Sequence, residues 1–225
     1  MYALNTKDLK DNVAKAYSKP MSKNITESGK YNVIIDCAIW TDFSGWKGLE
    51  LHLLDENENK ARIALTYESN QGERFFGADQ LDAIMVCSSV KSLTSAPDSY
   101  VMWSRAEQSF TEQDVSGCPE LKGKELTLLL QRQLDAYEGQ NGVKETDGLR
   151  IYGVYQNKTE LSANEILDRV TIAEDIKESE ANLEKSPLFI TKRHKNLKGA
   201  KPVAGGSYVN NKPNENNDLD DDLPF

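Results

Sequence analysis

In two adjacent segments, apolar side chains occupy every second position. This alternation constrains the fold more than any other feature of the sequence. Leucine occupies every second position from 49 to 53 within residues 47–55, and apolar side chains do the same within residues 60–67. Because successive side chains of a strand point to opposite faces, each segment is expected to bury one face. The polar residues ENEN connect the two segments, and together they predict a β-hairpin, although an Asn-Gly turn is absent.

Three more segments are expected to be strands. Residues 29–41 are apolar, β-branched and opened by a glycine. Residues 125–139 have leucines at alternate positions 126, 128 and 130, but leucine also favours helices. We interpret the segment as a strand because a glycine turn precedes it and the loop sequence YEGQNG follows. Residues 149–156, LRIYGVYQ, are the last expected strand.

Helices are expected between and after these strands. Residues 77–90 have apolar side chains at helical spacing. Ser162 and Glu165 match the S-x-x-E capping box, which predicts a short amphipathic helix near residues 162–178. A further helix is expected at the start of the chain.

Five strands, one helix among them and long loops predict a mainly β fold with added helices, of the α+β class. We expect a closed or partly open five-stranded barrel of the OB type, with a two-sheet sandwich as the alternative. The connection 88–123 is long for a structureless loop, so it either contains further structure or lines a ligand site.

Charge divides the chain into three parts. The net charge is −9, yet residues 191–201 contain five Lys/Arg and no acid, whereas residues 202–225 contain five acids and one lysine. We expect a folded body in residues 1–190, a basic segment with a flexible Gly/Pro/Asn-rich linker in 191–217, and an acidic tip in 218–225. Since the body is also acidic, any positive surface on it must be local.

Several classes of protein and site are not expected. No apolar run approaches the roughly 20 residues that cross a bilayer, and the start of the chain lacks a secretory apolar stretch, so a cytoplasmic location is expected. Cys37, Cys87 and Cys118 are far apart and indicate free thiols. With two histidines and no CxxC pair, neither a metal site nor a cofactor is expected.

The last eight residues, DLDDDLPF, carry the most specific signal. An aromatic residue ends the chain beside a proline, so a tail can insert one ring into a partner while its carboxylate meets a basic rim. The acids just before it add long-range attraction to a basic partner surface. We interpret this tip as a protein-binding segment.

The DDDLPF ending resembles the acidic tip of bacterial single-stranded DNA-binding proteins, where acids precede an aliphatic residue, proline and phenylalanine. Asp220, Asp221 and Asp222 take the acidic places, Leu223 the aliphatic place, and Pro224 and Phe225 the terminal pair. The longer body looks more like the divergent phage members, which have an OB-fold body, a linker and the same kind of tail; in that case the location is the host cytoplasm.

The resemblance implies a non-catalytic protein that coats single-stranded DNA in replication, recombination and repair. It also implies that the tip binds replication and recombination proteins such as a polymerase, helicase, primase or nuclease. A membrane partner is not implied, and a homo-oligomer is compatible with the resemblance.

Binding single strands without sequence preference requires aromatic faces for the bases and basic side chains along the backbone. Phe43 and Trp46 are the leading aromatic candidates, because glycines and polar residues flank them. The basic segment either contacts DNA or holds the acidic tip within the chain. The complete candidate set is Trp40, Phe43, Trp46, Lys47, Lys60, Arg62, Tyr67, Arg74, Phe75, Trp103, Arg105, Lys122, Lys124, Arg132, Arg150 and Tyr152.

Two other functions remain as alternatives. The many carboxylates could hold Mg²⁺ in a nuclease, but the chain has no GxxxxGKS, HExxH or GxSxG motif. A protein-binding adaptor that carries the same tip would also explain the acidic body.

Overall fold

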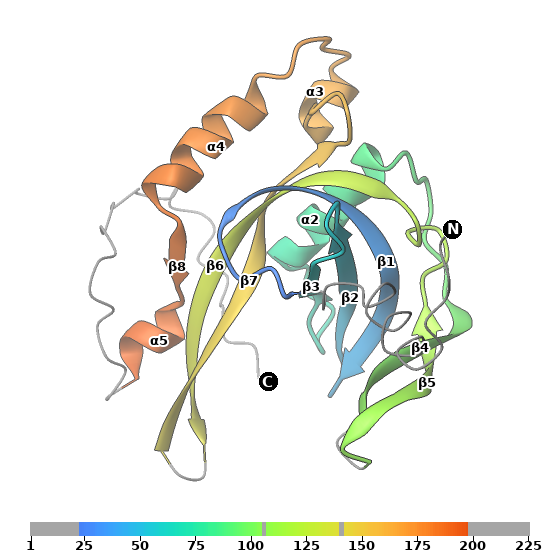
Figure 1. The fold of residues 1–225 in the computed structure, drawn as a ribbon, viewed down its shortest axis with the longest axis vertical. Coiled ribbons are helices and arrows are strands. Elements are labelled where there is room, and N and C mark those ends of the chain that lie inside the picture. The colour runs from blue at the N-terminus through green and yellow to red at the C-terminus, as the bar shows by residue number, and fades with distance from the viewer. Residues whose placement is uncertain (1–22, 105–106, 140–141, 198–225) are drawn as a thin grey trace, which may run out of the picture.

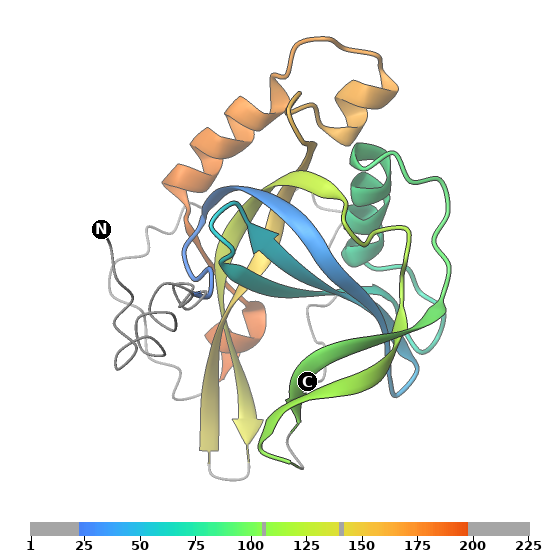
Figure 2. The same cartoon turned by 45° about the vertical axis from the view of Figure 1, so that its right-hand side comes forward.

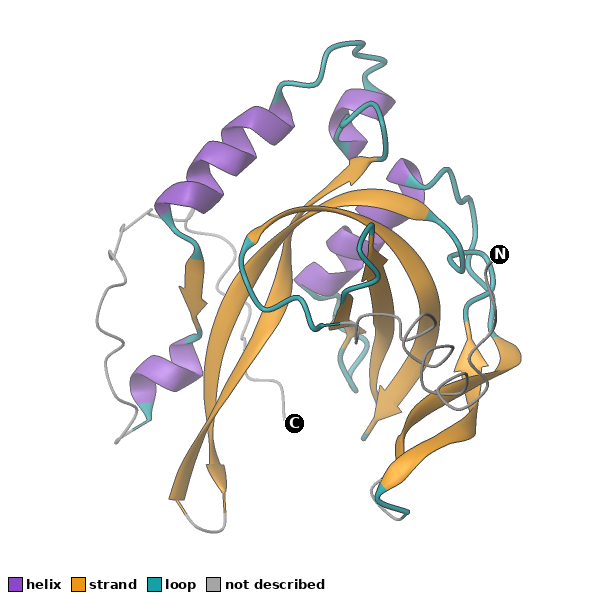
Figure 3. Cartoon of the chain, viewed as in Figure 1, coloured by secondary structure: helices purple, strands orange, loops and turns teal. Residues whose placement is uncertain are grey.

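One sheet of eight strands dominates the computed structural model, which describes residues 23–104, 107–139 and 142–197 (Figure 1). The strands are β1 (Gly29–Phe43), β2 (Trp46–Asp55), β3 (Lys60–Glu68), β4 (Ala96–Ser104), β5 (Ser109–Gly117), β6 (Glu125–Gly139), β7 (Gly142–Gln156) and β8 (Leu188–Ile190). The helices are α2 (Phe76–Cys87), α3 (Ala163–Leu167), α4 (Asp175–Lys185) and α5 (Lys192–Asn196). This is a mainly β arrangement with added helices, as expected from the sequence (Figure 3).

The long strand β1 connects the parts of the sheet. It pairs with β2 along one edge and, along its first six residues, with β6 on the other. A register shift between Ile35 and Cys37 bends it, and at Ile39 it pairs with β5. All these pairings are antiparallel, whereas β8 joins β6 in parallel. The described strands therefore form one continuous sheet and not the two facing sheets of a sandwich.

The main core lies between the curved sheet and α2. Leu49, Leu51 and Leu53 are at most 1% exposed, which confirms the buried face expected from their alternation. Helix α2 packs directly on β3: a Cβ on Gly77 would come within 2.1 Å of the Thr66 carbonyl oxygen. Glycine at this position therefore sets how closely the helix approaches the sheet.

The strand β6 is buried on both faces over its first half. Leu126, Leu128 and Leu130 belong to the main core, while Leu129 packs with Tyr155 of β7 in a second cluster. This second cluster is completed by Ile176 and Leu183 of α4, which covers the outer face of the sheet (Figure 2). Burial on both sides explains the unbroken leucine run that made this segment ambiguous between strand and helix.

The hairpin of β2 and β3 forms without an Asn-Gly turn because Asp55 holds the connection. One oxygen of its carboxylate accepts hydrogen bonds from the backbone N–H groups of Asn57 and Asn59, both at 2.8 Å. Glu58 adopts the positive φ, 61°, that the turn requires. An Asx-type turn thus takes the place of the Asn-Gly turn that is common in such hairpins.

Several expected boundaries were wrong. β6 has the bounds expected for the strand 125–139, but the sequence YEGQNG is not a loop of six residues: β7 starts at Gly142 instead of 149, because the two strands pair up to their ends. The connection 88–123 contains the hairpin of β4 and β5, and with the short strand β8 (Leu188–Ile190) the described chain has eight strands instead of the expected five. The capping box is confirmed: the Ser162 hydroxyl accepts from the Glu165 N–H, and the Glu165 carboxylate accepts from the Ser162 N–H.

The expected N-terminal helix, the linker and the acidic tip lie outside the described residues. The start of the basic segment lies within them: α5 occupies residues 192–196, and Arg193 pairs with Asp135 of β6. Within the described part of the chain, no helix has the length and apolar character needed to span a membrane.

Candidate nucleic-acid interface

A two-residue turn places the leading aromatic candidates opposite each other. Ser44 and Gly45 form a tight hairpin turn, with φ values of 53° and 84°. Two positive φ angles are typical of hairpin turns that match the twist of the strands. The strands therefore continue to Phe43 and Trp46, which form the last cross-strand pair.

Three rings gather at this end of the β1–β2 hairpin. The Trp46 ring lies parallel to the Phe75 ring, with centroids 5.2 Å apart and 3° between the planes. Phe43 is 62% exposed, and Phe76, the residue after Phe75, is 61% exposed. We call Phe43, Trp46 and Phe75 the hairpin-end cluster. An exposed ring beside a stacked pair is the kind of surface on which unpaired bases stack.

Trp40 and Tyr67 lie behind this cluster and contact the core. Both are half-buried, their rings meet edge to face at 5.9 Å, and the Trp40 indole N–H donates to the Thr94 carbonyl at 3.0 Å. Both were candidates for base stacking. In the fold, their contacts also close one end of the core.

The outer face of β2 and β3 carries a connected polar group. Glu50 is 7% exposed, and its carboxylate lies 2.6 Å from the His52 ring nitrogen and accepts from the Arg62 guanidinium. The Arg62 side chain is nevertheless 70% exposed. A buried carboxylate thus holds an arginine that faces solvent, and Lys60 lies two residues away on the same face.

The β4–β5 hairpin packs over this polar group. The Tyr100 ring meets the His52 ring at 4.8 Å, and the Tyr100 hydroxyl donates to the Asp36 carboxylate at 2.6 Å. Burial and this carboxylate raise the pKa of Tyr100, so it stays a neutral donor. The hairpin is therefore attached to the sheet at its base.

Most of the other basic candidates are engaged by carboxylates. Lys47 pairs with Glu68, Arg74 with Asp79 and Asp82, Lys122 with Asp98, and Arg132 with Asp147. Exposed ion pairs of this kind contribute little to stability, because solvent screens the charges. A phosphate can therefore replace the carboxylate at little cost, and the acidic body does not exclude a polyanion.

Three candidates lie elsewhere. The Arg150 guanidinium sits over the Phe189 ring, 4.1 Å from its centroid, and Tyr152 follows on β7. Lys124 is half-buried just before β6. These residues do not join the hairpin-end cluster.

The β4–β5 hairpin contains the remaining aromatic candidate. Trp103 pairs in register with Phe110, a residue that is 70% exposed and that the sequence did not single out. The side chain of Trp103 and all of Arg105 lie outside the described residues. Glu50, His52 and Tyr100 were also missed, because only the folded sheet brings them together.

Changing Glu50 to Gln is expected to lower the free energy of unfolding most at neutral pH. Burial raises the pKa of Glu50, but hydrogen bonds from His52 and Arg62 outweigh it and hold that pKa below 4.5. The charged form therefore stabilises the fold above that pH, and this contribution is lost as the pH falls through the folded pKa.

The difference in unfolding free energy between wild type and E50Q, measured by urea denaturation, should accordingly shrink from about pH 7 to about pH 4. Glu73→Gln, at an exposed position in the following loop, should show no such dependence. A constant difference across this range would contradict the assignment.

Among the described residues, no group of three or more His, Cys, Asp or Glu side chains is arranged to hold a metal ion. Cys37, Cys87 and Cys118 are free and buried, and burial raises the pKa of Cys87 to about 12. A scan against protein-family models and a search of curated proteins found no match to this chain.

Proposed function

We propose that this protein binds single-stranded DNA through the hairpin ends of its sheet and binds partner proteins through its C-terminal tip. The observation that carries the DNA-binding half is the hairpin-end cluster, in which Phe43 is 62% exposed beside the stacked pair of Trp46 and Phe75. Lys47 and Arg74 adjoin these rings in the sequence, and each has an exposed side chain. Aromatic faces with adjoining cations suit bases and backbone respectively.

The order of the strands supports an OB-type barrel as the basis of this function. In this interpretation β1, β2, β3, β6 and β7 are the five barrel strands, and α2 lies between the third and the fourth. β1 pairs with both β2 and β6, β6 pairs with β7, and β7 contacts β3. The β4–β5 hairpin is then an insertion after the helix. OB folds bind oligonucleotides on the face of their second and third strands and on two adjoining loops.

Three hairpin ends lie at one end of the molecule. The ends of the β1–β2, β4–β5 and β6–β7 hairpins all point toward the lower end in Figure 1, and the turned view agrees (Figure 2). Arg62 and Lys60 lie on the outer face of β3, the third strand of the proposed barrel, toward its end away from the β1–β2 turn, because Lys60 pairs with Leu54 whereas Glu68 pairs with Lys47. A strand of DNA that ran from the hairpin ends along this face would meet aromatic rings first and these cations after them.

The tip supplies the second half of the proposal. Its sequence combines three acids with a terminal Leu-Pro-Phe, and the segment before it is rich in Gly, Pro and Asn. A terminal ring on a long tether can reach a partner while the body holds DNA. The tip is anionic, so it is unsuited to bind phosphates itself.

A titration with oligo(dT) tests the proposal. Stacking on Trp46 should quench tryptophan fluorescence, and binding should weaken with salt along a slope of about −2 to −3, as expected if three or four cations meet phosphates. No quenching and no binding at low salt would favour the adaptor. Loss of a labelled oligonucleotide that depends on Mg²⁺ would favour the nuclease.

A further inference from the structure

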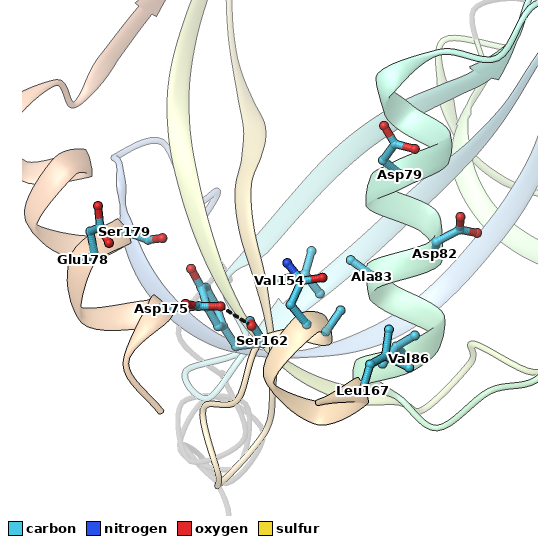
Figure 4. A pocket seen from close by; sticks show the side chains of 13 residues that line it. Asp79, Asp82, Ala83, Val86, Val154, Ser162, Leu167, Asp175, Glu178 and Ser179 are labelled. Atoms are coloured by element: carbon cyan, nitrogen blue, oxygen red, sulfur yellow. Dashed lines mark hydrogen bonds between the residues drawn. The ribbon is translucent and has the colours of Figure 1, made fainter. Parts of the chain in front are cut away.

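A cleft of about 500 Å³ opens between α2, α3 and α4 (Figure 4). It lies toward the end of the molecule opposite the hairpin ends, where α3 and the start of α4 are found (Figure 1). Small and aliphatic side chains form much of its lining: Ala83, Val86, Val154, Ala163 and Leu167.

Carboxylates stand on both sides of this apolar surface. Asp79 and Asp82 project from α2, and Asp175 and Glu178 from α4, while the lining of this cleft in the described chain includes no Lys, Arg or His. On the α2 side, Arg74 forms ion pairs with Asp79 and Asp82 and offsets part of their negative charge. On the α4 side, Glu178 is exposed and forms no ion pair with any other described residue. The cleft therefore suits an aliphatic segment with cationic flanks.

Hydrogen bonds within the chain hold α3 and α4, which form one side of the cleft, in place without a bound segment. Glu165 is 7% exposed and accepts hydrogen bonds from the backbone N–H groups of Ser162, Glu174 and Asp175. One carboxylate thus holds the starts of α3 and α4 together. Leu167 is 67% exposed in the lining, so an aliphatic side chain in this cleft is available for contact with another segment.

The N-terminal segment of the chain has the complementary composition. Residues 1–22 contain four lysines and two aspartates. At 3.6 residues per turn, Leu9, Val13 and Ala16 share one face, and Lys10 and Lys19 fall on either side of it. We propose that residues 1–22 bind in the α2–α3–α4 cleft of their own chain.

The tether favours the same chain over a second copy. The segment joins the body at Lys23, whose carbonyl accepts from the Lys60 N–H, and residues 18–22, extended at about 3.3 Å per residue, span about 17 Å between this point and the docking residues 9–17. A short tether raises the effective concentration to about the millimolar range, above that of free copies. Bound lysines would neutralise the α4 carboxylates. This proposal does not depend on DNA binding.

Hydrogen–deuterium exchange on the full chain tests the docking. Amides of residues 9–17 should exchange about tenfold more slowly than in a free peptide of the same sequence. Leu167→Asp and Glu178→Lys should each restore the rate of the free peptide. Phe110→Asp on β5 and Glu184→Lys on α4 are matched changes outside the cleft and should keep the protection.

Unchanged exchange of the α2 amides in each variant shows that the fold is intact. Exchange at the free-peptide rate in the wild type, or equal protection in all four variants, would overturn the proposal. Protection that grows with protein concentration would assign the segment to a second copy and overturn docking within one chain.

Discussion

Replacing Phe225 with alanine is expected to abolish partner binding while the affinity for single-stranded DNA stays unchanged. In the proposed function the terminal ring is the aromatic anchor of the tip, and truncating such an anchor costs about 2–4 kcal/mol, or about 30- to 1000-fold in affinity. The body and its hairpin ends are untouched by the change. Wild type and F225A would each be loaded on immobilised oligo(dT), and the bound polymerase, helicase, primase and nuclease would be quantified.

Tyr208→Ala is the matched control, because it removes an aromatic side chain from the same tail without altering the tip. It should bind partners as the wild type does. Equal recovery of these proteins by F225A and wild type would remove the role assigned to the tip. A parallel loss of DNA affinity in F225A would show instead that the tail takes part in binding DNA.

Local patterns in the sequence predicted the strands that bury one face. Leu49, Leu51 and Leu53 alternate because their strand has one face in the core, and the same logic identified β3. The Ser162–Glu165 capping box is local as well, and its geometry is confirmed. Where burial depends on neighbours within a few residues, the pattern was sufficient.

Features that depend on distant segments were not predictable in this way. The β4–β5 hairpin leaves Val101 and Phe110 exposed, so its strands lack a clear apolar alternation. Its position depends on the bond from Tyr100 to Asp36, residues 64 positions apart. The leucine run of β6 was ambiguous because α4, more than 40 residues later, covers its second face.

The candidate site shows the same limit. Phe43 and Trp46 could be ranked from their neighbours, but the parallel stacking of Trp46 on Phe75 requires the β3–α2 junction to return to the β1–β2 turn. Trp40 and Tyr67 ranked below them in the sequence, and only the fold shows that these two pack on the core. The sequence shows which residues are aromatic, but tertiary contacts determine which of their rings stay exposed to solvent.

Replacing Phe43 with alanine should weaken binding to oligo(dT) by about 5- to 150-fold, since stacking of one base on one aromatic side chain is worth about 1–3 kcal/mol. Because Phe43 is 62% exposed, the free energy of unfolding should change by no more than about 0.5 kcal/mol. Trp46 remains in this variant, so fluorescence quenching still reports binding.

Ile172→Ala is the control for this change, because Ile172 is 63% exposed on the connection between α3 and α4, at the other end of the molecule. It removes a similar apolar surface and should leave the affinity unchanged. If F43A binds oligo(dT) as tightly as I172A does, the hairpin-end cluster is not the base-stacking surface. The exposed ring of Phe110 on the β4–β5 hairpin would then be the next aromatic side chain to test, since the fold directs that hairpin toward the same end.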